Sequence, residues 1–200
     1  MEGLIRRNNF LRKLFLLLLS SYSFGDLSYG LPSSSQGVDT IYGSNYPVPA
    51  HDNRILFYVQ RSNNVNAIVY ETNIGKDGKI NREEPVHVYW KRYTSDSTVA
   101  ELNYVQRKYA YGIESKEIEG KNGQFILNFV SYDKKKFYLL PDRERNGYQA
   151  LTMINGKMAI LDRVFIQLSG GTFWFPTITN IELKGRDTLT KQVVIENFKP

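Results

Sequence analysis

The chain has 200 residues, of which 42% are apolar and 23% are charged, so it can bury the core of one ordinary domain and is not disordered as a whole. It contains no cysteine and only two histidines, which excludes disulfide frameworks, cysteine nucleophiles and thiolate metal sites. We therefore expect no metal ion and no cofactor. Aromatic residues make up 14% of the chain, a content that favours β structure.

Residues 1–25 have the features of a secretory signal peptide. Four basic residues precede the apolar run over 14–19, and small residues follow it, with Ser23 and Gly25 placed for cleavage after Gly25. The run is shorter than the roughly 20 apolar residues that span a bilayer, so a transmembrane anchor is the weaker interpretation. The sequence predicts an exported protein, periplasmic or secreted, with no transmembrane segment after cleavage.

Removal of this segment changes the charge of the chain. Residues 1–25 contain four basic residues and one acidic residue, Glu2, so half of the net charge of +6 belongs to the predicted signal. The mature chain keeps little of the positive charge that nucleic-acid binding requires. We expect no nucleic-acid partner.

The segment over 26–53 is rich in Ser, Gly and Pro and lacks sustained periodicity, which is typical of a linker or a loosely docked arm. A single β-rich domain is predicted over 54–200. Asn-Gly and Asp-Gly pairs separate its apolar runs, and these pairs accept the positive φ angles of tight hairpin turns. Asn155-Gly156 marks the clearest hairpin. The predicted strands cover 55–60, 67–73, 86–93, 125–131, 137–140, 148–154, 158–168, 177–183 and 192–198.

One segment has helical spacing. Thr98 and Glu101 fit a capping box, and apolar residues from Leu102 to Tyr109 recur every three or four positions. We predict a single helix over about 99–109 on this pattern. The fold class is mainly β: an antiparallel barrel-like sheet or a sandwich of about eight to ten strands with one short helix. The barrel-like form is preferred, because a helix can cover one of its ends.

Three charged residues fall on strand faces that otherwise consist of apolar residues. Arg61 continues the apolar face of the first strand, Arg92 that of the third, and Asp162 lies within the apolar face of the long strand over 158–168. Because an unpaired buried charge is costly, we predict an internal Arg–Asp cluster on the concave side of the sheet. The alternatives are a structural salt bridge, exposure at the rim, or a β-bulge that places Asp162 outside.

The segments Leu56 to Ser62 (LFYVQRS), Val88 to Trp90 (VYW) and Gln106 to Gly112 (QRKYAYG) resemble a family of uncharacterised secreted bacterial domains, labelled only as a domain of unknown function. The resemblance extends over most of 54–200. It implies export and one compact domain, and it supplies no activity, cofactor or catalytic residue.

The favoured function is an exported, non-enzymatic binding module that holds a small polar or anionic molecule. Its predicted ligand-binding residues are Tyr58, Gln60, Arg61, Trp90, Arg92 and Asp162. An alternative is a structural or interaction protein of the cell envelope with a protein partner. A carboxylate-dependent hydrolase with Asp162 or Glu71 as general base has the least support, since no acid–base pair can be placed at a known separation. A pocket, an exposed apolar patch and a cleft of titrating groups would distinguish the three.

Overall fold

Strands dominate the described part of the chain, as the aromatic and β-branched runs predicted. The structure is a computed structural model, and it describes residues 45–200 except 51, 94–97, 145 and 173–174. The predicted signal peptide over 1–25 and most of the predicted linker over 26–53 lie outside these residues.

The described residues form eleven strands and one short helical segment. The strands are β1 (Ile55–Arg61), β2 (Asn64–Thr72), β3 (Val86–Lys91), β4 (Val99–Glu101), β5 (Ile113–Glu117), β6 (Phe125–Phe129), β7 (Tyr132–Asp142), β8 (Gly147–Ile154), β9 (Lys157–Thr172), β10 (Phe175–Asp187) and β11 (Val193–Phe198). The helical segment consists of α2 (Tyr104–Gln106) followed directly by the π-helix η2 (Arg107–Tyr111).

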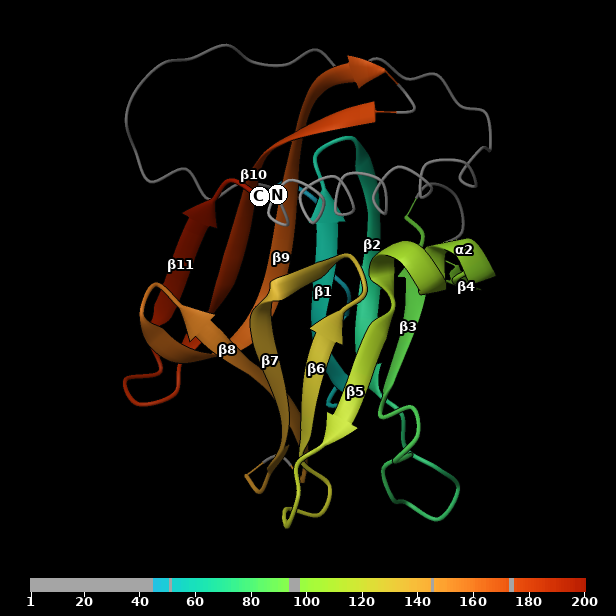
Figure 1. The fold of residues 1–200 in the computed structure, drawn as a ribbon, viewed down its shortest axis with the longest axis vertical. Helices are drawn as coiled ribbons and strands as arrows, with labels where there is room; N and C mark the ends of the chain where they lie inside the picture. The colour runs from blue at the N-terminus through green and yellow to red at the C-terminus, as the bar shows by residue number, and fades with distance from the viewer. Residues whose placement is uncertain (1–44, 51, 94–97, 145, 173–174) are drawn as a thin grey trace, which may run out of the picture.

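One sheet contains all of these strands. Nine follow each other in the order β4-β3-β2-β1-β9-β8-β7-β6-β5, and β10 and β11 extend from β9. The sheet curls into a half-barrel, with β5, β6 and β7 facing β1, β2 and β3 (Figure 1). The prediction of a mainly β, barrel-like sheet with one short helix is confirmed.

One strand pair departs from the antiparallel prediction. β1 and β9 are parallel, with Tyr58 beside Arg163 and Arg61 beside Ile166. The other strand pairs of the described sheet are antiparallel. Asn-Gly turns report only on strands that follow each other directly, and this pair joins two distant parts of the chain. The parallel pair joins the β1–β4 half of the sheet to the half that starts with β9.

The β8–β9 hairpin is the one that the sequence marked most clearly. Asn155 and Gly156 have φ angles of 47° and 75°, and Ile154 pairs with Lys157. Two successive positive φ angles match the twist of the flanking strands. This turn was therefore readable from two residues alone.

The helix begins later than predicted. Val99–Glu101 forms strand β4, which pairs with β3, and the first helical residue is Tyr104. The capping box is built by Asn103 and Gln106 rather than by Thr98 and Glu101. Asn103 accepts a hydrogen bond from the Gln106 backbone, and the Gln106 side chain accepts one from the Asn103 backbone. The actual cap lies five residues downstream of Thr98, because β3 offers a pairing partner to the residues of β4 between them.

The main core lies on the concave side of the half-barrel. Phe57 and Tyr70 stack with ring centroids 4.5 Å apart, and Phe129 from the opposite wall meets Tyr70 edge-on at 5.5 Å. The helix closes the gap between the two ends of the sheet: Trp90 on β3 contacts Tyr111, and Ser131 beyond β6 donates a hydrogen bond to the Ala110 carbonyl. The helix thus covers one side of the half-barrel.

A β-bulge at Asp162 interrupts the alternation of β9. Lys184 on β10 pairs with Arg163 and Gly185 pairs with Leu161, so Asp162 is the extra residue. Side chains on the two sides of a bulge change faces. Consequently Val164 and Ile166 face the concave core, whereas Arg163 faces outward.

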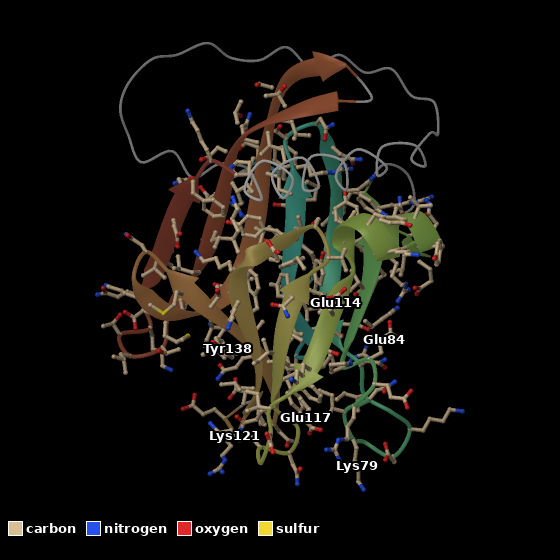
Figure 2. All side chains as sticks on the ribbon, in the orientation of Figure 1. Lys79, Glu84, Glu114, Glu117, Lys121 and Tyr138 are labelled. Carbon is tan, nitrogen blue, oxygen red and sulfur yellow. The ribbon has the colours of Figure 1, made fainter. Side chains whose placement is uncertain are left out.

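Charged side chains gather at the ends of the strands away from the helix. Figure 2 labels Lys79 in the β2–β3 connection, Glu117 at the end of β5 and Lys121 in the connection that follows. Arg82 donates hydrogen bonds to Glu117, which joins the first two of these regions. Among the described residues, no helix combines the length and the apolar character needed to cross a membrane.

Candidate binding cavity

The concave side of the sheet encloses a cavity of about 80 Å³. Seven strands and the π-helix η2 contribute to its wall, which is almost entirely apolar. Where one strand supplies neighbouring wall residues two positions apart, as β9 does with Val164 and Ile166, they share a face of the pleat. The aromatic side chains of the wall are Tyr70, Tyr111, Phe129, Tyr132, Phe137 and Phe198.

The polar groups of the wall are held by neighbours within the fold. The hydroxyl of Tyr70 donates a hydrogen bond of 2.9 Å to the carbonyl of Tyr111. Burial raises the pKa of Tyr70 well above its ordinary value of 10.0. Lys135 lies 2.7 Å from Glu196 and also over the ring of Phe198. The wall therefore contains one cation, which is paired with a carboxylate outside the wall, and a set of phenol hydroxyls that stay neutral.

Arg61 lies on the same concave face, next to this wall. It is 7% exposed, and its guanidinium carbon lies 5.3 Å from the centre of the Trp90 ring and 5.9 Å from that of Tyr111. Among the described residues no carboxylate lies within ion-pair distance of it, and its Nε is buried without a hydrogen-bond partner. Burial raises the pKa of Tyr111, and the Arg61 charge opposes this shift.

Trp90 is positioned by the helix cap. Its indole nitrogen donates a hydrogen bond of 3.3 Å to the Gln106 side-chain oxygen, the same atom that accepts from the Asn103 backbone. The structure thus brings Arg61 and Trp90 together, as the sequence predicted. Neither the helix cap nor Tyr111 was predicted to belong to this group.

The prediction of an internal Arg–Asp cluster is wrong. Asp162 forms a two-pronged pair with Arg186, with nitrogen–oxygen distances of 2.8 and 3.1 Å, and both side chains are about one-third exposed. The bulge turns Asp162 away from Arg61. Arg92 directly follows β3, its side chain is exposed, and it forms no ion pair with Asp162 among the described contacts. The alternative of a bulge with a structural salt bridge is the one that the structure adopts.

Tyr58 and Gln60 lie on the outer face of β1. Gln60 is fully buried because residues near the start of the described chain cover it: its amide donates a hydrogen bond of 2.6 Å to the Pro47 carbonyl. Tyr46 packs edge-on against Phe165 at 5.4 Å. The wall of the concave cavity includes none of the six predicted ligand-binding residues among the described side chains, and only Arg61 and Trp90 share its face.

The outer face also holds a buried ion pair that sequence reasoning missed. Arg163 on β9 and Glu182 on β10 form a salt bridge, and their side chains are 6% and 0% exposed. Arg163 also lies over the ring of Phe165. A signal was present, since Leu161 and Phe165 are apolar residues on the face that alternation assigned to solvent.

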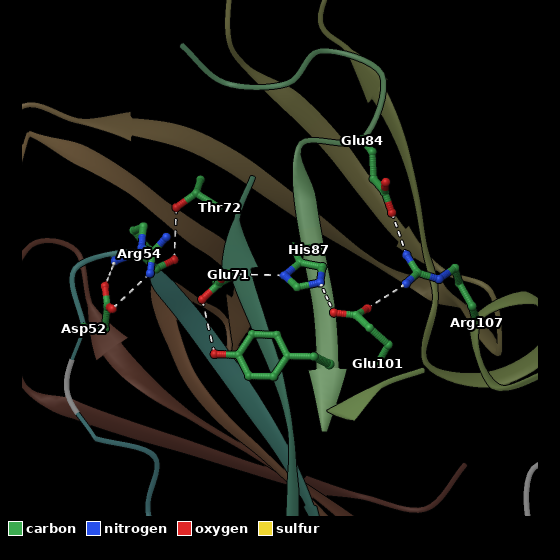
Figure 3. Close-up of polar contacts among 9 residues, drawn as sticks. Asp52, Arg54, Glu71, Thr72, Glu84, His87, Glu101 and Arg107 are labelled. Atoms are coloured by element: carbon green, nitrogen blue, oxygen red, sulfur yellow. Dashed lines mark hydrogen bonds and ion pairs between the residues drawn. The ribbon is translucent and has the colours of Figure 1, made fainter. Parts of the chain in front are cut away.

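A second polar network lies on the outer face of β2, β3 and β4 (Figure 3). His87 stands between two carboxylates, with ring nitrogens 3.4 Å from Glu71 and 2.9 Å from Glu101. Tyr89 donates a hydrogen bond to Glu71, and burial together with this carboxylate raises the pKa of Tyr89 to about 12. These contacts link three neighbouring strands at a half-exposed surface.

Residues 57–197 match the family model described as a domain of unknown function, DUF4833. The chain belongs to this family. The predicted resemblance to a domain family of unknown function is therefore confirmed. No match was found among curated proteins or among solved structures. Arg61, the helix and every residue of the cavity wall except Phe198 lie within the matched part of this DUF4833 chain.

Proposed function

We propose that this DUF4833 domain is an exported, non-enzymatic binding module, and that its concave cavity holds a small molecule with a compact apolar body. The cavity is the observation that carries this proposal. A volume of about 80 Å³ admits about five to eight water-sized groups, because each needs roughly 10–15 Å³. A six-carbon chain or one aromatic ring is of this size.

The wall supports binding rather than catalysis. Ligand sites are concave, mostly apolar and carry few polar groups, which fits this wall. The two carboxylates considered as general bases do not line it: Asp162 is paired with Arg186, and Glu71 accepts a hydrogen bond from Tyr89 on the outer face. No acid–base pair points into the cavity from the described residues.

Native mass spectrometry tests the proposal on protein purified from its own envelope. We expect a retained mass that is lost on denaturation. Val164→Phe fills the cavity from β9 and should abolish the retained mass. Val193→Phe, at a position that is 57% exposed, is the control and should keep it. Equal retention by both variants would place the ligand elsewhere and overturn the proposal.

Export is supported by the basic and apolar pattern of residues 1–25. Protein recovered from the envelope fraction should begin at Asp26 on N-terminal sequencing. Recovery of chain that still begins at Met1 in the cytosolic fraction would contradict export.

The alternative, an envelope interaction protein, is favoured by one group of side chains. Met153, Met158, Leu189 and Val193 are between 38% and 90% exposed and come from the β8–β9 hairpin and the β10–β11 turn. The Thr188 backbone donates to the Met158 carbonyl, which holds the two turns together. If this surface binds an envelope protein, Leu189→Ser should release the chain from envelope complexes on native gels, whereas Val164→Phe should not.

A further inference from the structure

Arg61 is a buried cation without a counter-charge in the described fold. Its 7% exposure leaves it little hydration, and its two ring contacts use the attraction of aromatic faces for a cation. Such contacts recover only part of the cost of removing a charge from water. Buried arginines are ordinarily paired with a carboxylate, as Arg163 is with Glu182.

The backbone places Arg61 at the edge of the cavity. Val59, two residues earlier on the same face, lines the cavity, and so does Ile166, the direct neighbour of Arg61 on β9. Tyr111 belongs both to the cavity wall and to the ring pair that contacts the guanidinium. Arg61 is thus separated from the cavity by one side chain of its wall, Tyr111.

We propose that the ligand is a small monocarboxylate, with its apolar body in the cavity and its carboxylate on the Arg61 guanidinium. This inference rests on the proposed function. Arginine presents N–H donors in a fork that matches the two oxygens of a carboxylate. The Arg61 side chain donates no hydrogen bond to a described residue, and its Nε is buried.

The net charge of the site favours a ligand with a single negative charge. The wall itself contains one cationic side chain, Lys135, whose Nζ lies 2.7 Å from the Glu196 carboxylate, so it adds no net positive charge. One guanidinium balances a carboxylate, whereas a phosphate dianion requires more positive charge than the described wall supplies. The helix cap fixes Trp90 through Gln106, so the aromatic support of Arg61 is in place before a ligand binds.

A pair of matched probes tests the inference. Hexanoate and hexanamide have the same carbon chain and differ in the charge of the head group. Isothermal titration of the full mature chain should show hexanoate binding roughly tenfold or more tightly, the effect of a charge-assisted hydrogen bond. In Arg61→Met the two probes should bind equally, whereas the exposed Arg92→Met should keep the wild-type preference.

The outcomes separate this inference from the proposed function. If both probes bind the wild type equally, the proposed binding function is retained and the assignment of a carboxylate ligand is wrong. If neither probe binds, the assignment of a carboxylate ligand is also wrong. The binding function is then tested separately, by the retained mass in native mass spectrometry. Equal loss of preference in Arg61→Met and Arg92→Met would mean that general charge attraction, and not this site, causes it.

Stability gives a second readout that a merely structural role would not produce. Methionine keeps the apolar stem of Arg61 and removes an uncompensated charge, so Arg61→Met should unfold at the same or a higher temperature than wild type without ligand. Hexanoate should raise the unfolding temperature of wild type and not that of Arg61→Met. A variant that unfolds at a clearly lower temperature would show that Arg61 serves the fold, and the inference would be wrong.

Discussion

Arg61 and Arg163 are two buried arginines on opposite faces of the same pair of strands. Arg163 faces outward and is neutralised within the fold by Glu182. Arg61 faces the concave side, where rings and not a carboxylate surround it. One sheet thus satisfies a buried charge on its outer face and leaves another unsatisfied beside a cavity. The inferred carboxylate site therefore uses the arginine that the described fold leaves without a counter-charge, and the paired arginine is left to the stability of the sheet.

The largest expected effect belongs to the outer pair. Glu182→Gln removes the carboxylate opposite a guanidinium that is 6% exposed, and it should lower the free energy of unfolding by about 3–5 kcal/mol. Urea denaturation measures this loss. Replacing both partners, as Glu182→Met with Arg163→Met, should recover most of it. An equally large loss in Arg61→Met would erase the distinction between the two faces.

Alkaline pH should act next most strongly, through the buried hydroxyls of the concave face. Burial raises the pKa of Tyr70 and of Tyr111, so both stay neutral in the folded chain. The stability that they add is complete below pH 10, the ordinary tyrosine value, and is lost as the pH rises above it. Each should cost about 1.4 kcal/mol per pH unit there.

Urea titrations between pH 9 and 11.5 test this expectation. The double variant Tyr70→Phe with Tyr111→Phe should lose stability with pH less steeply than wild type. Tyr104→Phe, at a position that is 69% exposed, is the control and should keep the wild-type slope. The same slope in all three proteins would show that these hydroxyls do not determine the alkaline limit.

Two glycines test the division between the two arginine sites, because each lies where two backbone segments approach closely. Gly112 follows the helix beside Arg61, and Gly185 lies on β10, the strand that carries Glu182. A Cβ on Gly112 would lie 1.9 Å from the Arg107 carbonyl oxygen, and one on Gly185 would lie 2.3 Å from that of Ile160. Both alanine variants should lose about 1–3 kcal/mol through overpacking. Only Gly112→Ala disturbs the helix that carries Tyr111, so only this variant should weaken hexanoate binding. Comparable weakening in Gly185→Ala would contradict the division.

The smallest effect is expected at the half-exposed pair on the bulge. Asp162→Ala should lower the free energy of unfolding by about 1 kcal/mol or less, since water screens a pair that is one-third exposed. Hexanoate binding should not change. A double-mutant cycle with Arg186→Met isolates the pair. A loss as large as that of Glu182→Gln would place Asp162 among the buried charges after all.

Local signals predicted much of this fold. The turn at Asn155-Gly156 and the strand runs depend on neighbours in sequence, and they appear where expected. The strands β4 and β5 and the late helix start were not predicted. At β4 and the helix start, pairing with β3 outweighs a capping pattern at Thr98. The parallel contact of β1 with β9 could not be predicted from local signals either, since it joins distant segments of the chain.

The candidate site was predicted in part. Period-two alternation placed Arg61 and Trp90 on one face, and this was right because β1 and β3 keep their alternation there. It failed at Asp162, where one extra residue breaks the alternation, so that Ala159 and Leu161 before it join the core instead of Met158 and Ile160. Arg163 was missed because the outer face of the sheet, which the alternation left to solvent, is buried there, and with it the pair that Arg163 forms with Glu182. Whether any of the six residues contacts a ligand stays a prediction.

The parallel pairing of Tyr58 with Arg163 has a consequence for how the chain folds. The contact that joins the β1–β2 hairpin to β9 closes a loop of about a hundred residues, and such closures are slow. The hollow beside Arg61 takes walls from both halves. The hollow is therefore complete only after β1 and β9 have paired, and a nascent chain that stops before β9 lacks the side of the wall that β9, β10 and β11 supply.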